Sequence, residues 1–127
     1  MKLFESGKIT NDSKRAHYRI MAELEADMQV GSAKMPVLIT DISLGGARVE
    51  SYNELESDKA MLISFAIQNQ RISALCRIVH IIEETSIPHI YGIKFETIWE
   101  ADVDKINTFI FSRQAILRRR RHALAEG

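Results

Sequence analysis

Two short motifs in the N-terminal half of the chain carry side chains suited to binding a nucleotide. The first is R-x-x-x-R, with Arg15 and Arg19, and the second is D-x-S-x-x-G, with Asp41, Ser43 and Gly46. An arginine guanidinium is a planar fork of donors, which matches the O6 and N7 acceptors of guanine or two phosphate oxygens. An ionised aspartate only accepts hydrogen bonds, so it can bind the N1 and N2 edge of the same base. Together the motifs predict a site for a guanine nucleotide.

The order and placement of the motifs make them more specific than either is alone. In a strand, Asp41 and Ser43 would lie two residues apart and point to the same face. Gly46 would permit a positive φ or a close approach of the backbone to a ligand. Ten arginines in a short chain will often give one R-x-x-x-R pair, and Asp, Ser and Gly are common turn residues. The conjunction of a basic motif before the first strand with the second motif at a hairpin is much less common.

Alternation of apolar and polar residues predicts that β-structure positions these motifs. Ala22, Leu24, Ala26 and Met28, for example, alternate with acidic residues, as in a half-buried strand. Turns are expected at Gly31-Ser32, Gly45-Gly46 and Asn69-Gln70. Further strands are expected within VLITDIS, residues 47–51, MLISFAIQ, RISALCRIVHII and IYGIKFETI. Short strands with no helix between them indicate an antiparallel barrel or sandwich.

The last quarter of the chain predicts one long helix. Thr97 and Glu100 have the spacing of a capping box, in which each side chain bonds a backbone N–H at the helix start. Acidic residues follow at the start, and Arg118 to Arg121 lie near the end, so both groups would complement the helix dipole. The residues expected along one apolar face are Val103, Ile106, Phe109, Ile110 and Leu117.

The two motifs, which read RAHYR and DISLGG here, resemble the paired signature of the PilZ domain family. The later YGIKF is similar to a glycine-containing strand near the end of such domains, and the resemblance covers about residues 13–115. It implies a six-stranded antiparallel β-barrel with a C-terminal helix. It also implies that the ligand is cyclic di-GMP, gripped by Arg15 and Arg19, with Asp41, Ser43 and Gly46 forming the facing wall.

Lys14 precedes the arginine motif. In the family a basic residue at this place accompanies an intercalated ligand dimer, so Lys14 is expected to contact ligand and two nucleotides are expected per chain. The implied function is that of a receptor: ligand binding changes the surface offered to an effector protein. Outputs of such receptors in the family include motility, exopolysaccharide synthesis and virulence.

Three segments are expected: a flexible lead-in over 1–12, a PilZ-like domain over 13–115, and a basic helical extension over 116–127. Hydrophobic residues make up 46% of the chain, and 17 basic residues balance 17 acidic ones. This composition is typical of one globular domain and argues against a nucleic-acid or membrane coat. We therefore expect a cytoplasmic protein that neither inserts into a membrane nor binds nucleic acid.

No catalytic constellation, P-loop or dinucleotide fingerprint is found, so an enzyme is not expected. The single cysteine, Cys76, is expected to be buried and inert. The four histidines show no spacing suited to a metal. Two alternatives to the receptor stay open. One is an adaptor that binds proteins without nucleotide, and the other is a small nucleic-acid binder that uses the arginine-rich helix.

Overall fold

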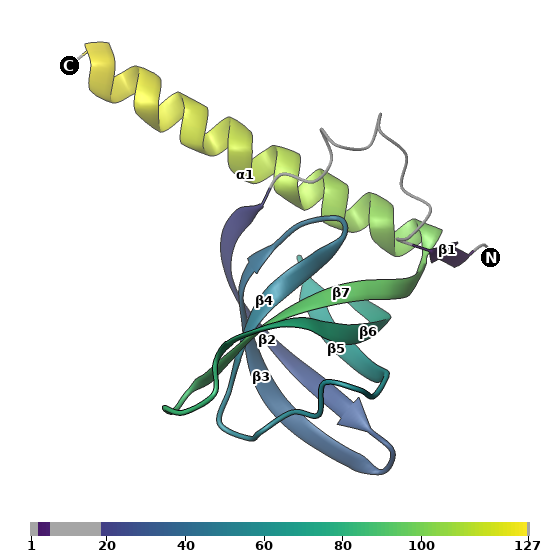
Figure 1. Ribbon diagram of the computed structural model, residues 1–127. Coiled ribbons are helices and arrows are strands. Elements are labelled where there is room, and N and C mark those ends of the chain that lie inside the picture. The colour runs from purple at the N-terminus through teal and green to yellow at the C-terminus, as the bar shows by residue number, and fades with distance from the viewer. Residues whose placement is uncertain (1–2, 6–18, 127) are drawn as a thin grey trace.

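Residues 3–5 and 19–126 are described by the computed structural model, in which a β-barrel carries one helix across its end (Figure 1). The elements are β1 (Leu3–Glu5), β2 (Ile20–Val30), β3 (Ala33–Ile42), β4 (Gly46–Ser51), β5 (Met61–Ile67), β6 (Gln70–Glu83), β7 (His89–Trp99) and α1 (Glu100–Glu126). The strands alternate buried and exposed residues over much of their length, most regularly in β5. This period of two is what a sheet with one face on a core requires.

The barrel is closed by β7, which pairs with β4 on one side and with β6 on the other. The other neighbours follow in the order β4, β3, β2, β5 and β6, and all of these pairings are antiparallel. The predicted six-stranded antiparallel barrel with a C-terminal helix is therefore confirmed. The short β1 adds a strand beside the end of β7. The sequence analysis predicted no strand there.

The barrel interior is filled by aliphatic side chains around an aromatic pair. The rings of Phe65 and Phe95 stack with centroids 6.4 Å apart, and both residues are fully buried. Helix α1 adds Ile106 and Ile110, which are also buried, while Val103 and Phe109 pack partly against the core. These four confirm the predicted apolar face of the helix. Leu117 does not, because it is exposed.

Two predicted boundaries are wrong by a few residues. The β5–β6 turn is formed by Gln68 and Asn69, both with positive φ, and Gln70 already belongs to β6. Positive φ at both central positions is the geometry whose twist matches a two-residue hairpin. Thr97 caps no helix, because it lies within β7 and pairs with β1 and β6. Pairing with both neighbouring strands holds the backbone of Thr97 in an extended conformation, which overrides the local capping signal.

The helix begins at Glu100 and continues to Glu126, beyond the arginine cluster. Glu100 and Asp102 lie in its first turn, as predicted, but the last turn carries no basic residue. The expected complement between the arginines and the end of the helix dipole is therefore wrong. Among the described residues, no helix is both long and apolar enough to cross a bilayer.

Burial of Cys76 predicts a thiol that does not react in the folded protein. Its side chain lies against Met28, with 3.6 Å between the sulfur atoms, and burial raises the pKa of the thiol to about 12. Thiolate is the reactive form. At pH 8 a thiol with this pKa is ionised in only about one molecule in ten thousand, because the two values differ by about four units. Ellman's reagent should therefore label Cys76 rapidly in guanidinium chloride and negligibly in native buffer. Rapid labelling of the native protein would contradict the buried placement.

Candidate ligand-binding site

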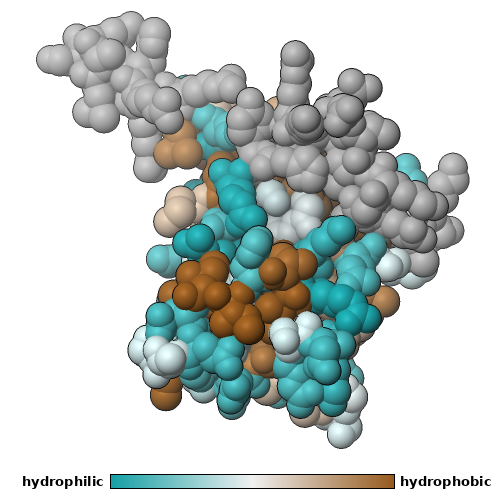
Figure 2. Space-filling view, viewed as in Figure 1, coloured by the Kyte–Doolittle hydropathy of each residue, from teal (hydrophilic) through white to brown (hydrophobic). Residues whose placement is uncertain are grey.

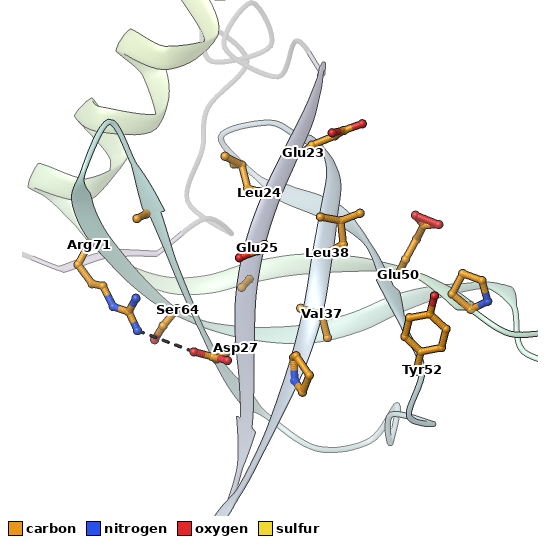
Figure 3. Close-up of a pocket in the computed structure, with 14 residues that line it drawn as sticks. Glu23, Leu24, Glu25, Asp27, Val37, Leu38, Glu50, Tyr52, Ser64 and Arg71 are labelled. Carbon is orange, nitrogen blue, oxygen red and sulfur yellow. Dashed lines mark ion pairs between the residues drawn. The ribbon is translucent and has the colours of Figure 1, made fainter.

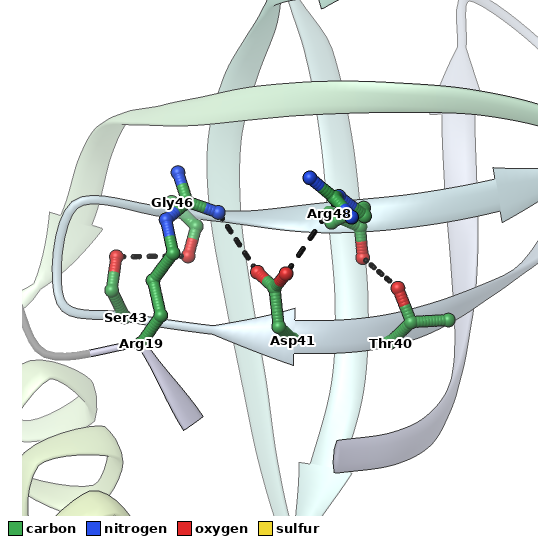
Figure 4. Close-up of polar contacts among 6 residues, drawn as sticks. All are labelled: Arg19, Thr40, Asp41, Ser43, Gly46 and Arg48. Atoms are coloured by element: carbon green, nitrogen blue, oxygen red, sulfur yellow. Dashed lines mark hydrogen bonds and ion pairs between the residues drawn. The ribbon is translucent and has the colours of Figure 1, made fainter. Parts of the chain in front are cut away.

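Pairing of β2 with β3 brings the second arginine of R-x-x-x-R to the aspartate of D-x-S-x-x-G. Arg19 directly precedes β2, and the register places Met21 opposite Asp41. The Arg19 Nη1 donates to the Asp41 Oδ1 at 2.8 Å (Figure 4). The arginine side chain is 56% exposed and the aspartate side chain only 13%. The two motifs, 22 residues apart in the chain, thus form one polar site at the surface of the barrel.

Arg48 on β4, an arginine outside both motifs, lies on the other side of the Asp41 carboxylate. The β3–β4 register pairs Asp41 with Arg48, and the Arg48 Nε lies 3.7 Å from the Asp41 Oδ2. The ladder has an irregularity between Ile39 and Asp41, and the Thr40 hydroxyl donates to the Arg48 carbonyl at 3.4 Å. One carboxylate therefore stands between two guanidinium groups, which leaves the trio with a net positive charge.

Arg48 was not among the site residues predicted from the sequence. The signal was present, because Arg48 follows Gly46 by two residues and so continues the D-x-S-x-x-G motif as G-x-R. In an antiparallel hairpin, a residue at that place can lie across from the start of the motif. An arginine opposite an aspartate is a favourable cross-strand pair.

Ser43 holds the turn between β3 and β4. Its backbone N–H donates to the Gly46 carbonyl at 2.8 Å, and its hydroxyl lies 3.3 Å from the same oxygen. The side chain is buried. A hydroxyl keeps acceptor capacity after it donates once. Ser43 thus fixes the loop beside Asp41 and retains an oxygen that can accept a further hydrogen bond.

Gly46 has a structural role that differs from the two predicted for it, which were a positive φ and a close approach of the backbone to a ligand. Among the described glycines only Gly31 has a positive φ, so Gly46 is not required for that reason. A Cβ at Gly46 would instead collide with the carbonyl oxygen of Ile93 on β7. Next to this contact, the Phe95 N–H donates to the Gly45 carbonyl at 2.9 Å. The glycine therefore permits close approach of β4 to a neighbouring strand, and its place in the wall of the ligand site stays a prediction.

Lys14 and Arg15, the other predicted ligand contacts, lie outside the described residues. No group of three metal-ligating side chains occurs in the described part of the chain. The site assembled by the described residues is thus a surface trio of one carboxylate and two guanidiniums beside a tight turn.

Comparison with known proteins decides the family. The sequence matches the PilZ domain over residues 13–112, which include both motifs and all six barrel strands. The chain belongs to the PilZ family. PilZ domains are receptors and have no enzymatic activity of their own. No match is found among the curated proteins.

Three solved PilZ structures share the fold at low sequence identity. The Bacillus subtilis inhibitor of motility MotI/DgrA matches with a TM-score of 0.70 and 16% identity over 80% of this chain. Escherichia coli YcgR in complex with c-di-GMP matches with a TM-score of 0.70 and 18% identity over 87% of this chain. This chain spans about half the length of those two proteins, 52% and 50%. The isolated PilZ domain of YcgR, also with c-di-GMP, matches with a TM-score of 0.59 and 16% identity; 86% of this chain and 98% of that one are covered.

A second candidate in this PilZ domain is a groove away from the motif residues. A groove of about 1010 Å³ lies over β2 and β3, and acidic side chains such as Glu23, Glu25 and Asp27 line it (Figure 3). None of the motif residues that the structure describes lines this groove. Carboxylates disfavour a phosphate-bearing ligand, so the groove is a poor candidate for the nucleotide site. The trio of Arg19, Asp41 and Arg48, which has a net positive charge, is the better candidate for the nucleotide site.

The contact between Gly46 and β7 makes this glycine a stability residue of the PilZ barrel. Gly46→Ala should lower the free energy of unfolding by about 3 kcal/mol or more, because overpacking here displaces a backbone rather than a side chain. The matched control is Gly92→Ala, whose added Cβ would lie 3.3 Å from the exposed His80 side chain. Denaturant unfolding followed by circular dichroism measures both variants. Equal losses for the two would contradict the role given to Gly46.

Proposed function

We propose that this PilZ domain is a cyclic di-GMP receptor that signals to an effector protein. The observation that carries the proposal is the 2.8 Å contact between Arg19 and Asp41, which joins the two signature motifs. The fold similarity to PilZ domains bound to c-di-GMP agrees with it but, at 16–18% identity, supports the fold alone.

The charges of the trio suit one face of a guanine nucleotide. Asp41 offers acceptors to the N1–H and N2–H edge of the base, and a guanidinium offers donors to O6 and N7 or to a phosphate. On binding, the ion pair between Arg19 and Asp41 would open, and each partner would exchange its contact for one with the ligand. Arg48 stays beside Asp41 and keeps the carboxylate paired with a cation while Arg19 turns to the nucleotide. The charge of Asp41 is therefore compensated by an arginine both before and after the ligand binds.

The first motif supplies the remaining contacts in this proposal. Arg15 grips a second acceptor pair on guanine or phosphate, and Ser43 completes the wall opposite. The residues before β2 then close over the ligand, and the altered surface is offered to the effector protein. An adaptor that binds its effector without nucleotide is the alternative, and titration with cyclic di-GMP separates the two.

Calorimetric titration with cyclic di-GMP should show binding at micromolar ligand or below. Arg15→Ala, Arg19→Ala and Asp41→Ala should each weaken binding at least about tenfold, because a bidentate arginine–guanine contact contributes roughly 1–3 kcal/mol. The matched control for Arg19→Ala is Arg71→Ala. Arg71 is also exposed and also lies near an aspartate, with 3.9 Å between its Nη2 and the Asp27 Oδ2. The Arg71→Ala variant should bind cyclic di-GMP with the affinity of the wild type.

Each result of the titration has a defined meaning. No binding heat with the wild-type protein, together with no shift of its melting temperature by ligand, would contradict the receptor and favour the adaptor. Binding that survives Asp41→Ala would show that the ligand lies elsewhere. Circular dichroism of each variant checks that a loss of binding is not a loss of fold.

The stoichiometry should be two nucleotides per chain. Two stacked cyclic dinucleotides carry about four phosphate charges, so a third cation beside Arg15 and Arg19 is electrostatically reasonable, and Lys14 is placed in the sequence to supply it. The calorimetric end point measures the ratio in the wild type. Lys14→Ala should lower it toward one, whereas a wild-type ratio of one would refute the stacked pair.

A further inference from the structure

A hollow with an acidic lining lies at the end of the barrel opposite α1. It measures about 610 Å³ and is lined by Glu54, Leu55, Glu56, Ser57, Asp58, Ile81 and Glu84. Four of these seven residues are carboxylates. Among the described residues, ion pairing reaches only one of the four, Glu56, from Lys59 at 3.0 Å. A hydrogen bond with the Glu54 carboxyl raises the pKa of Glu84, which is the signature of two acids held close together.

The strand next to this hollow exposes a run of apolar side chains. Val79, Ile81 and Ile82 of β6 are each 44–51% exposed. The ladder with β5 ends at Cys76, so the following part of β6 is paired only with β7 in the described chain. Figure 2 shows apolar side chains gathered in the middle of one face of the barrel, bordered by hydrophilic ones. Apolar side chains beside an acidic hollow suit a partner segment that is both apolar and cationic.

The chain itself carries a segment of that chemistry in the second half of α1. Ile110 is the last buried residue among the helix residues whose burial the structure describes, and Phe111, Ile116 and Leu117 are 56%, 40% and 46% exposed. Arg113 and Arg118 to Arg121 place five arginines on the same 16 residues, 111–126. At 1.5 Å per residue this segment is about 24 Å long. It projects beyond the barrel, as Figure 1 shows.

The projecting helix cannot reach the hollow of its own molecule. Strand β7 runs from His89, beside the hollow, to Trp99, which adjoins α1. Eleven residues of strand span roughly 35 Å. The register of Ser51 with His89 puts the 52–58 loop at the same end as Glu84, away from the helix (Figure 1). Only a second molecule can bring a helix to this hollow.

We propose that two copies of the chain form a reciprocal dimer, in which residues 111–126 of each α1 lie over the acidic hollow and β6 edge of the other. With the two barrels side by side and antiparallel, each helix extends sideways over the far end of its neighbour. The contact is then made twice about one two-fold axis, which closes the assembly at two copies. The chain is neutral overall with 17 charges of each sign, so the attraction arises from their separation between the two ends. It should therefore weaken with salt.

Sedimentation velocity across a concentration series tests the dimer. The wild type should be dimeric at tens of micromolar in about 50 mM salt and should dissociate in about 500 mM salt, because exposed charges are screened. Arg119→Glu/Arg120→Glu should be monomeric, and so should Glu54→Lys/Glu84→Lys. Equal amounts of the two variants should form a heterodimer, because the new glutamates of one variant then face the new lysines of the other while the second contact keeps its native charges.

The matched control is Glu23→Lys/Glu25→Lys, which reverses two acids in the groove over β2 and should leave the dimer intact. Glu54→Gln/Glu84→Gln removes two charges without reversing them. It should weaken the dimer, but less than Glu54→Lys/Glu84→Lys does. A wild type that stays monomeric at all concentrations would overturn the proposal. So would a dimer that survives both charge reversals, or reversed variants that fold but do not combine. Calorimetry on the monomeric variants measures whether they still bind nucleotide. This tests the receptor proposal independently of the dimer.

Discussion

Strand β7 closes the barrel, because among the described strands it alone pairs with both β4 and β6. The β4 ladder requires the two backbones to approach at Gly46, where any side chain would meet the Ile93 carbonyl. The same approach sets the turn that holds Ser43 and therefore the strand end that carries Asp41. A contact between two backbones thus positions the polar site as well as closing the core.

The position of Asp41 also explains why two arginines accompany it. Its side chain is 13% exposed, and a largely buried carboxylate is costly unless charges or donors compensate it. Arg19, just before β2, and Arg48 on β4 provide that compensation, while each keeps about half of its own side chain in solvent. The site is therefore built with a surplus of positive charge at the surface. Such a surplus attracts anions without any change in the neutral charge of the whole chain.

The sequence predicted the strands, the barrel and the helix well, because period-two patterns such as β5 and the buried face of α1 directly reflect burial. It failed where non-local pairing overruled a local signal. Thr97 has the composition of a cap, yet two ladders hold it in β7. The contact of Gly46 with β7 was not predicted, because Ile93 lies almost 50 residues further along the chain. Arg48 was overlooked because its role depends on register, which a linear motif does not specify.

The late place of β7 in the chain has a consequence for synthesis on the ribosome. Strands β2 to β6 can pair with one another as soon as they emerge, but β4 and β6 each keep an open edge until residues 89–99 arrive. Open edges of this kind are templates for wrong pairing between nascent chains. A translational pause before residue 89 would prolong that exposure, whereas rapid synthesis of β7 and α1 would end it. Codon choice over β7 and α1 should therefore affect the yield of folded protein more than codon choice elsewhere.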